Sequence, residues 1–379
     1  MPMSRALDAV GENRLLAQWT AHQRRHPEQL NALHEADAEL VPLPGSDRLL
    51  AVTTDTVSEE IALGFYRDPE TIGWVAAAAS LSDLAAVAAE PVGLVVAVSI
   101  PRDATRAFVE GLAAGLDAAA RAAGTYVLGG DTNIGAAVSV TTTAIGTVAT
   151  GERLTRMGCG AGEVVYASGR LGAGALPVLR AMGLSAGEGQ GPAAAAGGAS
   201  VPFRPPLRLR EARLLPGWAT ACMDTSDGLV ATLDQLARLN GVGFDVTAPL
   251  AEVLEPAVRE ALECAGLDPL LALGQPHGEF ELVFTVPAAL AAAFEAHARR
   301  GGFEPVRLGV TTDAGPAALA PALRFSGDGA PRTLDGARIR NVVDEEAGDL
   351  RRCAAALAAE LATPSLSQPP RAPAGAALR

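Results

Sequence analysis

Short apolar runs rich in β-branched residues alternate with alanine-rich segments over the first 150 residues of this chain. The runs of strand length lie at residues 49–55, 93–100, 125–128 and 138–148. Between them, residues 69–87 and 104–123 have helical composition, and Asp68-Pro69 is a typical helix start. Strands that alternate with helices indicate a mixed α/β or α+β fold rather than an all-α or all-β fold.

The length of 379 residues predicts two domains, with a boundary where the composition changes near residue 150. Residues 5–33 are predicted to be largely helical, and the Gly- and Ala-rich residues 186–200 are predicted to form a flexible loop. We therefore expect an amino-terminal helical extension at 1–34, a first α/β domain at 35–150, a second at 151–345, and a helix with a disordered tail at 346–379.

A strand-like run ends at Gly129-Gly130-Asp131-Thr132, and this motif is the first candidate for a binding site. We interpret the two glycines as a tight turn that lets the backbone approach a ligand closely. The carboxylate of Asp131 could then hold a hard cation. An ordinary turn is the alternative for a motif of this kind taken alone.

Several other aspartates follow or flank apolar runs, and most of them have Thr, Ser or Gly beside them. Caps and turns explain any single one of these residues. Together they predict a magnesium site, because Mg²⁺ prefers oxygen ligands and converging carboxylates repel one another unless a cation lies between them. The set consists of Asp37, Asp55, Asp83, Asp131, Asp224 and Asp227.

The chain contains no lysine, and all 30 of its basic residues are arginine. This excludes a Walker A phosphate loop, the strand lysine of protein kinases and a Schiff-base lysine for pyridoxal phosphate. The net charge of −13 argues against nucleic acid as a partner. Phosphates could still be bound through divalent cations that bridge them to carboxylates.

The four cysteines are scattered without paired spacing, so neither a zinc site nor a disulfide framework is expected. The amino-terminal segment has no apolar core typical of a signal peptide, and no apolar run approaches the length of a membrane span. We expect a cytoplasmic protein without a membrane partner.

Five motifs stand in the order and spacing that resemble thiamine-monophosphate kinases. They are Thr54-Asp55, Ser82-Asp83-Leu84-Ala85-Ala86, Gly129-Gly130-Asp131-Thr132, Arg156 with Gly158 to Gly162, and Asp224 to Leu229. This family is similar to aminoimidazole ribonucleotide synthase, selenophosphate synthetase and a hydrogenase maturation factor, which form one superfamily. The resemblance extends from about residue 35 to about residue 335.

The resemblance implies the two-domain fold of aminoimidazole ribonucleotide synthase, with an amino-terminal sheet that pairs with a second copy in a homodimer. It implies ATP and Mg²⁺ as co-substrate and cofactor, with Asp131 and Asp227 as catalytic residues and Glu281 at the substrate. The implied metal ligands are Asp37, Thr54, Asp55, Asp83, Asp131, Asp224 and Asp227. The implied ATP contacts are Gly129, Gly130, Asp131, Arg156 and Ser226.

The departures from the family pattern lie in the acceptor half. Ala36 replaces a carboxylate, and Ala62 stands where the family has a histidine that touches the substrate. The aromatic lid near the end of the family motif is absent, and residues 337–340 stand near that place. His277 lies in an altered substrate motif and could contact an acceptor, but we expect a solvated loop histidine.

The first hypothesis is an Mg²⁺-dependent ATP phosphotransferase that acts on a small-molecule phosphate acceptor, with thiamine phosphate as the family's acceptor. One alternative is an ATP-dependent ligase or cyclase of the aminoimidazole ribonucleotide synthase type. Another is a nucleotide-binding homologue without catalysis, which the alanines at 36 and 62 and the missing lid would favour. Selenophosphate synthesis and hydrogenase maturation are disfavoured by the positions of Cys159 and Cys353.

Overall fold

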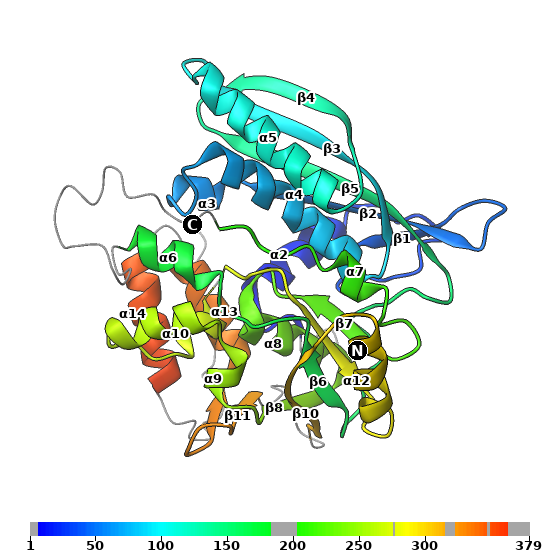
Figure 1. Cartoon of the computed structure of the whole chain (residues 1–379), viewed down its shortest axis with the longest axis vertical. Helices are drawn as coiled ribbons and strands as arrows, with labels where there is room; N and C mark the ends of the chain where they lie inside the picture. The colour runs from blue at the N-terminus through cyan, green and yellow to red at the C-terminus, as the bar shows by residue number, and fades with distance from the viewer. Residues whose placement is uncertain (1–6, 183–202, 276, 315–322, 347–348, 363–379) are drawn as a thin grey trace.

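Two β-sheets with surrounding helices form the chain, which confirms the predicted mixed α/β class (Figure 1). The computed structural model describes residues 7–182, 203–275, 277–314, 323–346 and 349–362. The predicted loop at 186–200 and the predicted tail beyond 362 lie outside these ranges. Among the described residues, no helix is both long and apolar enough to cross a membrane.

The first sheet has five strands, and α4 and α5 pack on one of its faces (Figure 1). All neighbouring strands are antiparallel except β3 and β4, which are parallel and leave β4 at an edge. In spatial order the strands are β1 (Glu39–Pro42), β2 (Arg48–Val57), β5 (Ser139–Ala149), β3 (Glu90–Pro101) and β4 (Val127–Gly135). The two helices are α4 (Pro69–Ala86) and α5 (Arg106–Ala122).

Helix α4 begins where the sequence predicts it. The Asp68 side chain accepts a hydrogen bond from the Thr71 backbone N–H, and Pro69 takes the first helical position. Glycine in α5 lets the two helices pack closely, because a Cβ at Gly115 would lie 2.0 Å from the carbonyl oxygen of Glu70. The alanines of α4 are buried on all sides, so this helix is an interior element.

The second sheet has seven strands, of which only β11 and β8 run parallel to each other. Their spatial order is β12 (Arg332–Leu334), β11 (Leu323–Phe325), β8 (Val242–Val246), β10 (Val306–Asp313), β6 (Val164–Ala167), β9 (Leu282–Val286) and β7 (Ala221–Asp224). The larger helices around it are α6 (Ala175–Ala181), α8 (Gly228–Asn240), α10 (Pro256–Cys264), α12 (Ala291–Arg300), α13 (Gly336–Glu345) and α14 (Leu350–Ala362). Short helices are α3 (Glu59–Ala62), α7 (Leu209–Ala212), α9 (Leu250–Val253) and α11 (Leu271–Gly274).

The second sheet separates two hydrophobic cores. Tyr166 and Phe284 point into the same core as Leu81 of α4, so this core joins the two sheets. Their strand neighbours Val165 and Val283 point to the opposite face, into the core that contains α8. Because α4 also contacts β7, the last turn of α4 and the end of β7 lie at the junction of the two halves.

Two predictions of local structure are wrong. The helix predicted for residues 5–33 is limited, within the described residues, to a turn at Leu7 and α2 (Gly11–Thr20). After α2 the chain instead runs beside β1, where the Leu30 N–H donates to the Leu40 carbonyl and Asn31 accepts from the Leu40 N–H. The predicted turn at Gly129-Gly130 is instead part of β4, just after a register shift at Leu128, and glycine is needed there because a Cβ at Gly130 would lie 1.7 Å from the Val96 carbonyl oxygen.

Candidate functional site

Three of the predicted metal ligands meet where the two halves of the chain join. One carboxylate oxygen each from Asp37, Asp83 and Asp224 lie within 4.8 Å of one another. Asp37 precedes β1, Asp83 lies in the last turn of α4, and Asp224 ends β7. The cluster therefore forms only because α4 packs between the two sheets.

Hydroxyl groups hold these carboxylates in place. Thr53 Oγ1 donates to Asp83 Oδ2 at 2.5 Å, and Ser82 Oγ donates to Asp224 Oδ2 at 2.7 Å. Ser226 Oγ donates to the other oxygen of Asp224 at 3.1 Å. The sequence predicted Ser226 as a nucleotide contact, whereas the supporting roles of Thr53 and Ser82 were not predicted, although Thr53 precedes the Thr54-Asp55 motif and Ser82 begins the Ser82-Asp83 motif.

Arg156 brings a positive charge to the cluster. Its Nη2 donates to Asp37 Oδ1 at 2.8 Å, and the Asp37 side chain is fully buried. Burial alone would lower the pKa of Arg156, but the charge and hydrogen bond of Asp37 raise it above its usual value. Arg156 therefore stays charged and offsets only part of the negative charge.

The cluster is rich in negative charge that the protein itself does not balance. Burial first, and then the Asp37 charge, raise the pKa of Asp224 to about 7. Burial raises the pKa of Asp55 to about 6, and that of Asp83 is also raised, first by burial and then by the charge of Asp55. One oxygen each of Asp37 and Asp55 is buried and has no hydrogen-bond partner within the described part of the chain. A set of oxygen donors with excess negative charge and free lone pairs fits a hard cation such as Mg²⁺.

Asp227 lies beside this cluster, immediately before α8. Its side chain lines a cavity and is exposed there, although protein atoms surround it closely. Burial raises its pKa to about 6. Asp227 therefore connects the carboxylate cluster with the cavity.

Two predicted metal ligands lie on the other face of the first sheet. The Thr54 hydroxyl bonds to Thr142 O and Thr143 Oγ1 instead of to the carboxylates. Asp131 of β4 pairs with Ala97 of β3, Ala97 pairs with Thr141 of β5, and Thr141 pairs with Thr56 of β2. Paired residues point to the same face of a sheet, and here it is the face that α4 and α5 do not cover. Within one chain, the β4 residues Gly129, Gly130 and Asp131 are thus separated from Asp55 by β3 and β5.

Two residues of the altered substrate motif are buried in internal contacts. Glu281 accepts hydrogen bonds from Arg208 Nε at 2.7 Å and Nη2 at 2.6 Å, and Ser168 also donates to it. The expectation of a solvated His277 is wrong, because this side chain is 4% exposed, bonds to Tyr66 through Nε2 and stacks on Phe65. Burial lowers the pKa of His277 to about 4, so the ring is neutral at neutral pH.

Comparisons with known proteins agree with this architecture. Residues 35–148 match the family model of the AIR synthase related protein, N-terminal domain, and residues 160–319 match that of the C-terminal domain. The thiamine-monophosphate kinase of Synechococcus elongatus is 30% identical over 64% of this chain and 74% of its own length. That of Escherichia coli O157:H7 is 28% identical over 86% of this chain and 97% of its own length.

The chain belongs to the thiamine-monophosphate kinase family. It is an ATP-dependent kinase of that family, and the resemblance seen in its motifs is confirmed. AaThiL complexed with AMPPCP and TMP has the same fold, with a TM-score of 0.65, 20% identity, and coverage of 85% of this chain and 95% of that one. The hydrogenase maturation protein HypE of E. coli shares the fold at 22% identity, with a TM-score of 0.60 and coverage of 88% and 95%.

Proposed function

We propose that this kinase transfers a phosphoryl group from Mg²⁺-bound ATP to thiamine monophosphate. The observation that carries the proposal is the convergence of Asp37, Asp83 and Asp224 from both halves of the chain. The names of its relatives support this acceptor, because they are thiamine-monophosphate kinases and this chain matches them over most of their length.

In this proposal, the carboxylates of Asp37, Asp55, Asp83, Asp224 and Asp227 hold the magnesium ions. Magnesium held by these carboxylates would supply positive charge against the phosphates during transfer. Thr53 and Ser82 orient two of the carboxylates through their hydrogen bonds. Because the chain has no lysine, Arg156 is the cationic side chain at the cluster, and we assign it and Ser226 to the phosphates.

We propose that Asp131 and Thr54 act across a homodimer. Both are on the uncovered face of the first sheet, and the carboxylate cluster found among the described residues lies on the other face. The edge strand β4 exposes large apolar side chains, with Leu128 56% and Ile134 64% accessible. An uncovered edge of this kind is suited to contact with another copy, which would place Gly129, Gly130 and Asp131 at a shared nucleotide site.

The test is formation of thiamine diphosphate from ATP and thiamine monophosphate, followed by chromatography, with and without Mg²⁺. We expect product that depends on both the metal and the acceptor, and a loss of at least 100-fold for Asp224→Asn as an order-of-magnitude estimate. Glu304→Gln, a change at a residue outside the cluster, serves as the control. Absence of thiamine diphosphate at high enzyme concentration would overturn the acceptor, and unchanged Mg²⁺ binding by Asp224→Asn would overturn the metal site.

A further inference from the structure

The loop between β7 and α8 carries two of the proposed metal ligands, Asp224 and Asp227, so its shape decides where both carboxylates lie. Thr225 lies between them and is fully buried. Its Oγ1 donates to Glu279 Oε1 at 3.0 Å and accepts from the backbone N–H of Glu281 at 3.0 Å. The loop is therefore held by the segment that leads into β9.

Backbone hydrogen bonds join the same two segments. The Gly278 N–H donates to the Ser226 carbonyl at 2.8 Å, and the Thr225 N–H donates to the Glu281 carbonyl at 2.8 Å. The approach is so close that a Cβ at Gly278 would lie 1.4 Å from the Thr225 carbonyl oxygen. Phe280 has a φ of 60°, in the left-handed region that is strained for a bulky residue. The chain therefore keeps a costly local conformation where this segment meets the loop.

Glu279 is a buried carboxylate whose two oxygens bind two different segments. Oε1 accepts from Thr225, and Oε2 accepts from the Gly172 N–H in the turn before α6 at 2.7 Å. No arginine or histidine in the described ranges forms an ion pair with Glu279, whereas Glu281 pairs with Arg208 at 2.6 Å. A buried carboxylate without a cation costs stability unless its oxygens accept hydrogen bonds. Its place in the fold is thus explained by the segments that it joins.

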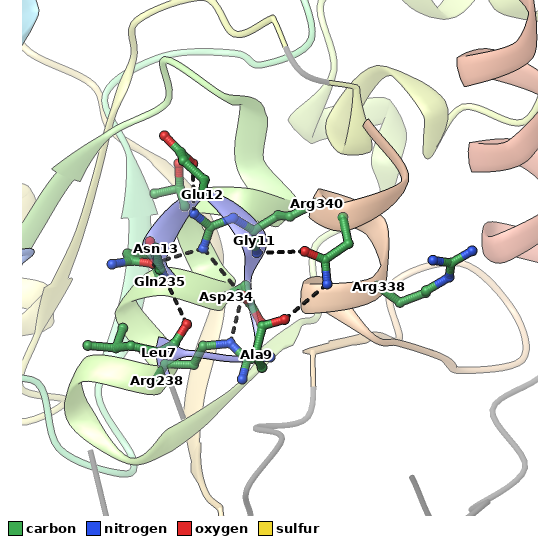
Figure 2. Close-up of polar contacts among 12 residues, drawn as sticks. Leu7, Ala9, Gly11, Glu12, Asn13, Asp234, Gln235, Arg238, Arg338 and Arg340 are labelled. Atoms are coloured by element: carbon green, nitrogen blue, oxygen red, sulfur yellow. Dashed lines mark hydrogen bonds and ion pairs between the residues drawn. The ribbon is translucent and has the colours of Figure 1, made fainter. Parts of the chain in front are cut away.

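The body of α8 is held separately, about two turns farther along the helix, as Figure 2 shows. Asp234 accepts from Arg238 Nε at 2.8 Å. Gln235 accepts from Arg340 Nη1 at 2.8 Å and from Asn13 Nδ2 at 3.1 Å. These hydrogen bonds do not involve residues 224–227, so the loop can shift while α8 keeps its place.

We propose that Glu279 and Thr225 are positioning residues for the metal site, which hold Asp224 and Asp227 in their binding arrangement before a cation arrives. The inference rests on the proposed magnesium site and adds two residues that are not themselves ligands. Converging carboxylates repel one another, so a loop without this support would let them move apart in the metal-free protein. The hydrogen bond between Thr225 and Glu279 opposes that movement, and less of the binding free energy is then lost in ordering the loop.

Calorimetric titration with Mg²⁺ tests the role of the hydroxyl. Thr225→Val removes it without changing any charge and should weaken Mg²⁺ binding at least about threefold, whereas Thr225→Ser keeps it and should restore the parent affinity. Thr285→Val is the matched control, because Thr285 is equally buried and its hydroxyl bonds to Thr220 at 2.7 Å. A smaller loss in Thr225→Val, or an equal loss in Thr285→Val, would refute the proposal.

Variants of Glu279 separate position from charge. Glu279→Gln keeps the shape but has one acceptor atom where the parent uses two, and Glu279→Asp keeps the charge but shortens the reach by one carbon. Both should weaken Mg²⁺ binding at least about threefold, because neither can hold Thr225 and Gly172 together as the parent does. If Glu279 acted through its negative charge alone, Glu279→Asp would bind Mg²⁺ as the parent does, and this result would overturn the inference.

Hydrogen exchange of the metal-free protein in EDTA gives a readout that does not depend on magnesium. The amides of residues 222–230 should exchange at least about threefold faster in Thr225→Val and Glu279→Gln than in the parent. The amides of α12 should exchange at the parent rate in both variants. Unchanged exchange in the loop would overturn the inference, and if Glu279→Gln does not fold, the Thr225 variants decide it.

The proposed metal site and this inference fail separately. Loss of Mg²⁺ binding in Asp224→Asn, together with parent-like binding in Thr225→Val, would refute the positioning role only. Parent-like Mg²⁺ binding in Asp224→Asn would refute the metal site, while faster exchange in EDTA would still show that Thr225 and Glu279 hold the loop.

Discussion

Arg156 and Asp37 form a buried ion pair with 2.8 Å between Nη2 and Oδ1, at the edge of a cluster in which carboxylates outnumber cations. Arg156 lies in the segment that connects the two sheets, and its backbone N–H also donates to the carbonyl of Glu35, two residues before Asp37. The pair therefore joins the connection between the two halves to the segment that carries Asp37, the first of the proposed metal ligands. Asp37 Oδ2 has no hydrogen-bond partner among the described residues and could accept another one.

Arg156→Ala should lower the free energy of unfolding of the metal-free protein by about 3–5 kcal/mol, because it leaves the Asp37 carboxylate buried without its cation. Denaturant unfolding in EDTA measures this loss, and added Mg²⁺ should restore part of it. Arg121→Ala breaks an exposed pair with Asp117 and should cause no measurable change. An Arg156→Ala protein as stable as the parent would contradict the interpretation.

The metal-free protein should become less stable as the pH rises from about 4 to about 7. The folded-state pKa of Asp224 is about 7 and that of Asp55 about 6, whereas an unfolded Asp titrates near 4. In this window the folded state holds protons that the unfolded state releases, so the free energy of unfolding falls with increasing pH.

Magnesium should reverse this dependence, since the cation and the protons compete for the same carboxylates. Thermal unfolding at pH 5, 6, 7 and 8 measures both effects, in EDTA and in Mg²⁺. Asp224→Asn should flatten the curve in EDTA. Stability that increases with pH through this window in EDTA would contradict the prediction.

Thr53→Val should weaken Mg²⁺ binding by roughly three- to tenfold, since it removes the hydrogen bond that orients Asp83, and such a bond contributes on the order of 1 kcal/mol. The adjacent Thr54→Val removes a hydroxyl on the other face of the sheet and should leave Mg²⁺ binding by the isolated chain unchanged. Calorimetric titration of both variants in the Ile134→Arg background, which we expect to be monomeric, distinguishes the faces. Equal loss in the two variants would show that the faces are assigned wrongly.

Ile134→Arg should dissociate the proposed homodimer and abolish kinase activity without unfolding the chain, because it places a charge on the exposed edge strand β4. Light scattering gives the mass, and circular dichroism checks the fold. Leu290→Arg changes an exposed apolar residue beside α12 and should retain both mass and activity. An active Ile134→Arg monomer would exclude a role for the partner's residues in the site.

Local sequence signals predicted many of the elements. The cap and proline at Asp68-Pro69 mark the start of α4, and the Val- and Thr-rich run at 138–148 forms β5. Strands β8 and β10 were not predicted, although apolar residues stand at every second position in both, at Val242, Phe244 and Val246 and at Val306, Leu308 and Val310. The turn at Gly129-Gly130 was predicted wrongly because glycine is equally suited to a turn and to a strand that closely approaches its neighbour.

The sequence by itself determined the order of the motifs, and with it the family and the supply of carboxylates for a metal. Only the tertiary structure decided which of those groups meet. Side chains alternate between the faces of a strand, so the register of β2 turns Thr53 and Asp55 toward α4 and Thr54 away from it. The Gly129–Asp131 segment, which as a motif indicated the site, lies on an edge strand away from the cluster, while the packing of α4 between the sheets brings Asp83 to Asp224.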